Sequence, residues 1–168
     1  MCENKPGIHS DIFLEILSQN ELEEGKDWNR RKVSENEYII QQGERSGKLY
    51  LVLNGLVRVV GYVELSKDSH VRPGVKDLGP GEVFGEISLF DRGVHNAGIM
   101  AVIKSEIVTI EGEALLDYCH THPEFGCRFF REVCCSLAHR LRSADQQIFR
   151  LLGWGLKVRG FEPILKDL

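Results

Sequence analysis

Hydrophobic and polar residues follow different periods along the chain, and the changes of period divide it into three parts. Over residues 8–19 the apolar side chains recur at helical intervals. They are Ile8, Ile12, Phe13, Ile16 and Leu17. This pattern predicts an amphipathic helix over residues 8–19, followed by a polar connector over residues 21–26.

Short runs of Val, Ile, Leu and Tyr fill residues 28–110 and are cut at close intervals by turn-forming residues. The cuts fall at residues 34–36, 43–47, 54–55, 72–74, 79–81 and 91–93. Many short strands with such punctuation predict an antiparallel sandwich or barrel, with a jelly roll among the candidates. Asn54-Gly55 is the strongest local hairpin signal. Residues 64–77 are polar and predict a long, mobile hairpin tip.

After Ile110 the period becomes helical. Residues 111–122 predict one helix, stopped by Pro123, and a longer helix follows it. Apolar residues then alternate at spacings of four and three, which is a heptad pattern. The heptad residues are Phe130, Cys134, Leu137, Leu141, Ala144, Ile148 and Leu151. The helix either packs on its own sandwich or forms a two-stranded dimer. We favour the dimer, at least for the second half, because one sandwich is too short to cover three heptads.

Glycines at positions 153, 155 and 160, together with Pro163, predict that this long helix ends near Leu152. We therefore divide the chain into a domain over residues 1–152 and a tail over residues 153–168.

The composition is that of a soluble globular protein. Of 168 residues, 42% are hydrophobic and 27% charged, and the net charge is −4, which gives no overall attraction to nucleic acid or anionic lipid. The sequence holds no segment apolar enough to span a membrane and no secretory signal, so we expect a cytoplasmic protein. Five cysteines in such a protein are expected to be reduced thiols.

No pattern of a catalytic site is visible. Residues 119–122 (Cys-His-Thr-His) and Cys127 are metal-ligand types, but they lie at a helix end without the usual partner spacing. Helix-end polarity and packing explain them more simply. We therefore expect no catalytic residue and no metal.

Three segments in order resemble the cyclic nucleotide-binding domain of the catabolite activator protein-like superfamily. They are residues 44–59, 78–90 and 104–110, and the resemblance extends over roughly residues 8–150. It implies a mostly β fold: an antiparallel double-stranded β-helix, or jelly roll, with an N-terminal helix and a long C-terminal dimerisation helix. The family's transcription factors continue into a helix-turn-helix domain, for which the 17 residues after Leu151 are too few.

The second segment matches the family's phosphate-binding cassette. Its residues here are Phe84, Gly85, Glu86, Ile87 and Ser88. Independently of the resemblance, a glycine before a short helical turn lets the backbone approach a ligand, and the exposed N–H groups suit an anion. In the family the glutamate accepts a ribose hydroxyl, which is the role implied for Glu86. The alternative is a tight turn in which Glu86 is solvated or caps the backbone.

The cassette departs from the family pattern after its short helix. The family has an Arg there that pairs with the cyclic phosphate. A gapless alignment places His95 at that position, and a loop longer by one residue places Asn96 there. Neither replaces the permanent, forked charge of a guanidinium. Arg92 is close by, but its loop position favours a solvated charge. Binding of cyclic AMP or cyclic GMP is therefore expected to be weak, altered or lost.

These observations favour a non-enzymatic sensor or regulatory module whose ligand shifts the long helix relative to the sandwich. Its expected partners are a second copy through Phe130–Leu151, a small anionic ligand and another protein, with no direct DNA or membrane binding. The alternative is a ligand-independent dimeric interaction scaffold with a vestigial pocket. An enzyme that uses the Cys/His cluster is a third, weaker possibility.

Overall fold

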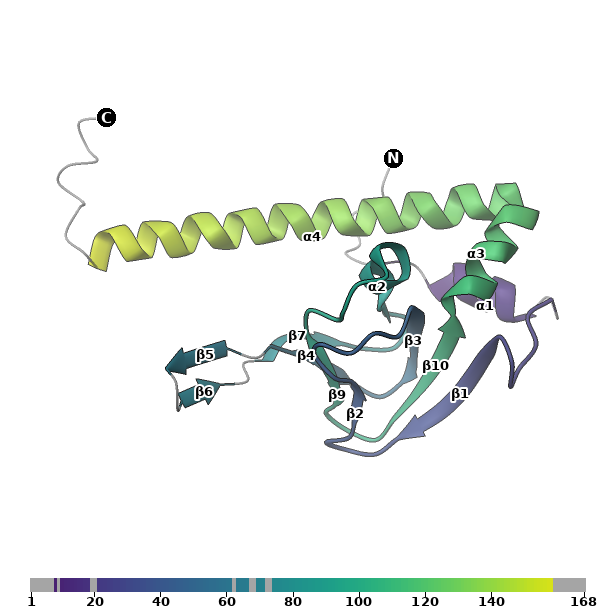
Figure 1. Cartoon of the computed structure of the whole chain (residues 1–168), viewed down its shortest axis with the longest axis horizontal. Coiled ribbons are helices and arrows are strands. Elements are labelled where there is room, and N and C mark those ends of the chain that lie inside the picture. Colours follow the sequence, from purple (N-terminus) through teal and green to yellow (C-terminus); the bar gives the residue numbers. More distant parts are fainter. Residues whose placement is uncertain are drawn as a thin grey trace.

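The computed structural model describes residues 8, 10–18, 21–61, 63–66, 69–71 and 74–158. A roll of short strands carries three short helices, and a long helix crosses it and continues beyond it (Figure 1). The helices are α1 (Ser10–Ser18), α2 (Glu86–Asp91), α3 (Gly112–Thr121) and α4 (Pro123–Val158). The strands are β1 (Trp28–Val33), β2 (Tyr38–Ile40), β3 (Lys48–Asn54), β4 (Val57–Val60), β5 (Val63–Ser66), β6 (Ser69–Val71), β7 (Gly74–Leu78), β8 (Val83–Phe84), β9 (Gly98–Ala101) and β10 (Ser105–Glu111).

Two four-stranded antiparallel sheets form the roll, in the orders β1-β10-β3-β8 and β2-β9-β4-β7. Strands β5 and β6 form a separate two-stranded sheet. Neighbours in both large sheets come from distant parts of the chain, as in β1 and β10, where Trp28 is opposite Ile110. The structure confirms the predicted antiparallel jelly roll with flanking helices.

The Asn54–Gly55 turn does not close the hairpin that the sequence predicts. Strand β3 pairs with β10 and β8, whereas β4 pairs with β7 and β9, so the turn passes the chain from one sheet to the other. Gly55 has φ 98°, and a Cβ there would lie 2.2 Å from Ser105 Oγ. Only glycine fits this close crossing. The hairpin predicted further along is confirmed in its backbone, since β4 pairs with β7 and β5 with β6.

Strand β3 separates two hydrophobic cores. Successive side chains of a strand point to opposite faces, so Tyr50 and Val52 face the interior of the roll, whereas Leu49 and Leu51 pack under the helices. Phe13 of α1 and Phe129 of α4 are fully buried in the helical core. Both shorter predicted helices are confirmed, at 10–18 for 8–19 and at 112–121 for 111–122.

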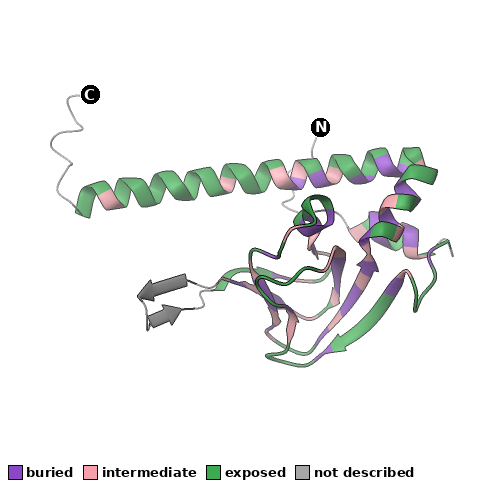
Figure 2. Cartoon of the chain, viewed as in Figure 1, coloured by how far each residue is buried: buried purple, intermediate pink, exposed green. Residues whose placement is uncertain are grey.

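Helix α4 has 36 residues and is therefore about 54 Å long. It packs on its own domain through a face near its start, and most of the rest is exposed (Figure 2). The buried residues of this face are Phe125, Gly126, Phe129, Val133 and Ser136. The predicted heptad residues follow these buried positions by one residue and so lie on a neighbouring face of the helix. Phe130 is 40% exposed, Leu141 65%, Ile148 54% and Leu151 67%, while Leu137 is half-buried against the helical core. Most of the heptad face is therefore left uncovered by the residues that the structure describes.

The predicted helix end near Leu152 is wrong, because α4 continues to Val158 and includes Gly153 and Gly155. A glycine inside a helix costs only about 1 kcal/mol relative to alanine, which good helix formers on both sides offset. The remainder of the predicted tail, residues 159–168, lies outside the described residues.

The cysteines are not all free thiols. Cys119, Cys127 and Cys134 are free, but Cys135 is disulfide-bonded, so the expectation of reduced thiols is wrong for Cys135. None of the helices in the described ranges is both long and apolar enough to cross a membrane.

Candidate functional site

The cassette begins where β8 ends against β3. Phe84, the last residue of β8, is buried and stacks on Tyr50, with ring centroids 5.0 Å apart. Gly85 follows with φ 92°, and a Cβ there would lie 2.7 Å from the Lys48 carbonyl oxygen and 2.9 Å from the Tyr50 ring. Glycine is therefore required twice, by its backbone angle and by the close approach of β3.

The first turn of α2 uses Ser88 internally. Its hydroxyl is buried and donates a hydrogen bond to the Gly85 carbonyl oxygen at 3.0 Å. Ile87 is 37% exposed and points away from the core. The sequence prediction of a glycine followed by a short helical turn is thus confirmed, with Gly85, Glu86, Ile87 and Ser88 brought together in one turn.

Glu86 is the charged residue of this turn and is only 3% exposed. Its carboxylate accepts a hydrogen bond from the Arg140 guanidinium on α4. A buried carboxylate requires such a partner, because removing an ionised group from water is costly. Glu86 is therefore not solvated, and its charge ties the cassette to the long helix.

Sequence reasoning missed the role of Arg140, which it treated only as a charge flanking the heptad. The two partners are 54 positions apart, so no local spacing connects them. The sequence analysis did not predict that Glu86 is buried, so it gave no reason to look for a cation on another element.

His95 lies in the segment between α2 and β9 and is 8% exposed. Its Nε2 is 2.7 Å from the hydroxyl oxygen of Ser46 in the β2–β3 loop. The backbone fixes the same contact, since the His95 N–H donates to the Glu44 carbonyl oxygen and the Gly43 N–H donates to the His95 carbonyl oxygen. Asn96, the alternative alignment position, is exposed.

Burial lowers the pKa of His95 below its ordinary value, because the charged imidazolium loses hydration. The carboxylates of Glu44 and Asp91 act in the opposite direction. The imidazole is therefore neutral near pH 7, and its Nε2 is already engaged with Ser46. A neutral imidazole lacks the permanent charge and the forked donors of a guanidinium.

The cluster at the end of α3 contributes to packing. Burial raises the pKa of the Cys119 thiol to about 11, and the His122 ring stacks on Tyr118 and contacts Glu21 at 3.1 Å. Within the described ranges no group of three or more His, Cys, Asp or Glu residues is arranged to hold a metal ion.

Comparison with known proteins extends these observations. The family described as "Cyclic nucleotide-binding domain" matches residues 30–122, which is more than half of the chain. The cyclic AMP receptor protein of Thermus thermophilus is 32% identical over 121 residues, covering 72% of this chain and 52% of the relative. A CRP-like cAMP-activated global transcriptional regulator of Mycobacterium tuberculosis is 24% identical over 114 residues, covering 68% of this chain and 47% of the relative. The chain thus spans about half the length of these curated relatives.

Solved structures agree with the sequence comparison. The catabolite activator protein of Thermus thermophilus superposes with a TM-score of 0.63 at 32% identity, covering 74% of this chain and 55% of that one. The c-di-GMP-responsive regulator CLP of Xanthomonas campestris has a TM-score of 0.66 at 21% identity, covering 85% of this chain and 64% of that one, and it supports the fold alone. With its roll, its cassette turn and its long final helix, the chain belongs to the cyclic nucleotide-binding domain family.

Proposed function

We propose that the chain is a non-enzymatic sensor module in which the occupancy of the cassette is transmitted to α4. The observation that carries this proposal is the contact between Glu86 and Arg140. It joins the residue expected to hold a ligand's ribose hydroxyl to the helix expected to transmit the signal. A ligand that needs the Glu86 carboxylate competes with Arg140, so its binding shifts the population toward a different packing of α4.

We further propose that cyclic AMP and cyclic GMP bind weakly or not at all. Gly85, Glu86, Ile87 and Ser88, after Phe84, form the proposed binding turn, but neither His95 nor Asn96 supplies a guanidinium. Loss of a buried charge-assisted pair costs about 2–5 kcal/mol, which corresponds to roughly 30-fold to several thousand-fold in affinity. The lowered pKa of His95 supports this proposal, since a neutral imidazole offers no charge to the phosphate.

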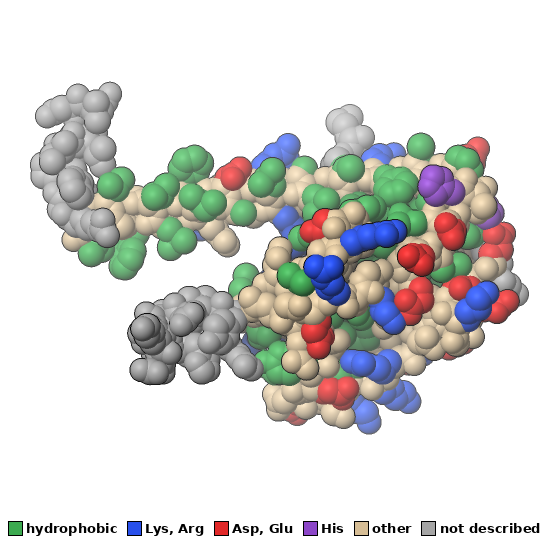
Figure 3. Space-filling model, in the orientation of Figure 1, with side chains coloured by type: hydrophobic (Ala, Val, Ile, Leu, Met, Phe, Trp, Pro, Cys, Tyr) green, Lys and Arg blue, Asp and Glu red, His purple; other side chains and the backbone are tan. Residues whose placement is uncertain are grey.

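The output of the module is proposed to be a homodimer that docks on another protein. The exposed heptad residues of α4 support the dimer, because contiguous apolar surface of this kind marks an interface. Hydrophobic side chains lie along the length of α4 that extends from the roll (Figure 3). The net charge of −4 favours a protein partner over DNA.

Calorimetric titration of the wild type with cyclic AMP and cyclic GMP tests the proposal. We expect a dissociation constant well above micromolar for both ligands, and sub-micromolar affinity for either would refute the loss of the anchor. Arg140→Gln frees the Glu86 carboxylate and should tighten binding if α4 competes with the ligand. Arg150→Gln, on the same helix but 10 residues further along, is the matched control and should leave the affinity unchanged.

The alternative function is a ligand-independent dimeric scaffold with a vestigial pocket. The extent of exposed apolar surface on α4 favours it, because that surface needs no ligand to act. The same titration decides between the two. If no cyclic nucleotide binds to the wild type or to Arg140→Gln at millimolar concentration, while the dimer persists, the scaffold is the correct function.

A further inference from the structure

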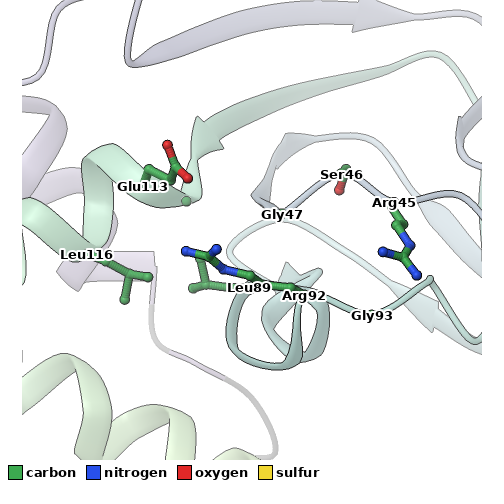
Figure 4. Close-up of a pocket in the computed structure, with 9 residues that line it drawn as sticks. Arg45, Ser46, Gly47, Leu89, Arg92, Gly93, Glu113 and Leu116 are labelled. Carbon is green, nitrogen blue, oxygen red and sulfur yellow. The ribbon is translucent and has the colours of Figure 1, made fainter.

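A pocket lies at the C-terminal end of α2, whereas the cassette turn lies at its start. It has a volume of about 290 Å³ and is enclosed by the β2–β3 loop, the end of α2 and the first turn of α3 (Figure 4). Its lining residues are Arg45, Ser46, Gly47, Leu89, Arg92, Gly93, Gly112, Glu113 and Leu116. The cassette turn is at the start of α2 and this pocket at its end, so the two are distinct places in the fold.

Two guanidinium groups enter the pocket from different elements. Arg92 reaches across it toward Leu116, whereas Arg45 projects on the side of Gly93 (Figure 4). Within the part of the chain that the structure describes, neither arginine has a hydrogen-bond or ion-pair partner. Both groups carry a permanent charge and a planar fork of donors. The pocket therefore presents two guanidinium groups without a direct partner, together with one carboxylate, that of Glu113.

The backbone conformation at Arg92 is unusual. This residue caps the C-terminus of α2 with φ 51° and ψ 21°, in the left-handed region that residues with side chains rarely adopt. Asn36 is the other non-glycine residue with positive φ in the described chain. Such strained backbone persists only where the surrounding structure requires it, and it is found most often at functional positions. Here the left-handed cap is where the side chain turns into the pocket.

A glycine lets the β2–β3 loop and the start of α3 pack closely at the wall of the pocket. A Cβ on Gly112 would lie 2.1 Å from the Gly47 carbonyl oxygen, so no side chain fits between the β2–β3 loop and α3. Gly112 and Glu113 begin α3, a helix of ten residues whose positive dipole end faces this side. The N–H of Gly93 is already used, since it donates to Asp91 Oδ1 at 2.7 Å.

We propose that this pocket binds the phosphate group of a small phosphorylated molecule. Two guanidinium forks and a helix start favour a dianion over a singly charged carboxylate. The volume is at the lower end for ligand pockets, about 300–1,000 Å³, which favours inorganic phosphate, pyrophosphate or a compact organic phosphate over a nucleotide. The Glu113 carboxylate opposes the charge of such a ligand and so limits its affinity.

Occupancy of this pocket reaches the cassette through Ser46. The residue lines the pocket, and its hydroxyl is the partner of His95 Nε2 at 2.7 Å. An anion held between Arg92 and the start of α3 also joins the β-roll to the helices, because the walls of the pocket come from both. The site therefore serves as a second input to the module, and it does not depend on cyclic nucleotide binding.

Calorimetry with inorganic phosphate, pyrophosphate and glycerol phosphate at constant ionic strength tests the proposal. Arg92→Gln and Arg45→Gln should each weaken binding by about tenfold, the loss typical of one charge-assisted hydrogen bond. Glu113→Gln should tighten it severalfold, because a repelling carboxylate is removed. Arg31→Gln, which removes an exposed arginine of β1, is the matched control and should change nothing.

The results separate this site from the cassette and one phosphate source from another. Glu86→Gln should weaken phosphate binding far less than Arg92→Gln does, whereas an equal loss in the two variants would assign the anion to the cassette and overturn the proposal. Binding of glycerol phosphate without inorganic phosphate identifies an organic ligand, and the reverse identifies the free anion. Absence of binding for all three probes at 10 mM, or equal effects of Arg92→Gln and Arg31→Gln, refutes the site. Unchanged melting temperatures show that the variants remain folded.

Discussion

The dimer proposed for α4 is tested most directly by charge on its heptad face. We choose Leu141→Glu combined with Ile148→Glu, because these side chains are 65% and 54% exposed in the isolated chain and do not belong to either core. Leu137 is a poorer choice, since it packs partly against the helical core and its substitution would also unfold the domain. We expect the double variant to be a folded monomer.

The magnitude follows from the exposed area that the dimer covers. Full burial of a leucine or isoleucine contributes about 1.5–3 kcal/mol, so covering the exposed part of each gives about 1–2 kcal/mol. With two residues in each of two protomers, the dimer loses about 5 kcal/mol before any repulsion between the new carboxylates. At 1.4 kcal/mol per tenfold, the dissociation constant rises by roughly a thousandfold or more.

Light scattering after size-exclusion chromatography measures the change at micromolar protein. The matched control is Phe149→Glu, which places the same charge on an equally apolar, 72% exposed position one residue off the heptad face. The control should remain a dimer. A monomeric wild type, a dimeric double variant or a monomeric Phe149→Glu protein would each refute the proposed interface.

Four further predictions concern the cassette. His95→Arg should strengthen cyclic nucleotide binding by at least tenfold in calorimetry if the gapless alignment is correct, and improvement with Asn96→Arg alone would favour the longer loop. Burial lowers the pKa of His95, so the unfolded chain binds the proton at a higher pH than the folded protein does. The contribution of His95 to stability is therefore complete above about pH 6.5 and is lost as the pH falls below that value. His95→Gln should flatten this loss of stability in thermal melts. A bound anion favours protonation of the same imidazole, so its affinity should be higher at about pH 5.5 than at about pH 8, and a flat profile would show that His95 does not touch the charge. Arg140→Gln leaves the Glu86 carboxylate buried without its partner and should cost about 1–2 kcal/mol of stability. The cost is less than for a fully buried pair because Arg140 is half-exposed. If the double variant Glu86→Gln/Arg140→Gln is no more stable than Arg140→Gln alone, the contact is not electrostatic.

The fold was largely predictable from the sequence because its signals are local. The helical period places α1 and α3 within two residues of their ends, and the turn residues separate the strands of the roll. Asn54–Gly55 shows the limit of this reasoning. The pair forms a turn, as its chemistry demands, but strand pairing depends on partners 50 residues away, such as β10 opposite β3. Local sequence does not encode that choice.

Only the part of the candidate site that is formed by the end of β8 and the turn after it could be predicted from the sequence. Gly85 and Ser88 form the expected turn because both act on their immediate neighbours. The contacts of Glu86 with Arg140 and of His95 with Ser46 join positions 54 and 49 residues apart. They arise from the packing of separate elements and leave no spacing that the sequence displays. The predicted end of α4 near Leu152 is wrong for another reason, since glycine weakens a helix without ending it.

The reach of α4 has a mechanical consequence. Its contact with the cassette is made at Arg140, and 18 residues separate that point from Val158, a distance of about 27 Å along the axis. In the proposed module the helix acts as a lever, with its pivot at the contact between Arg140 and the cassette. A tilt of about 10° at the pivot displaces the tip by about 5 Å, which is one helical turn. Breaking a single ion pair near the middle of α4 can thus change which surface is presented at its end.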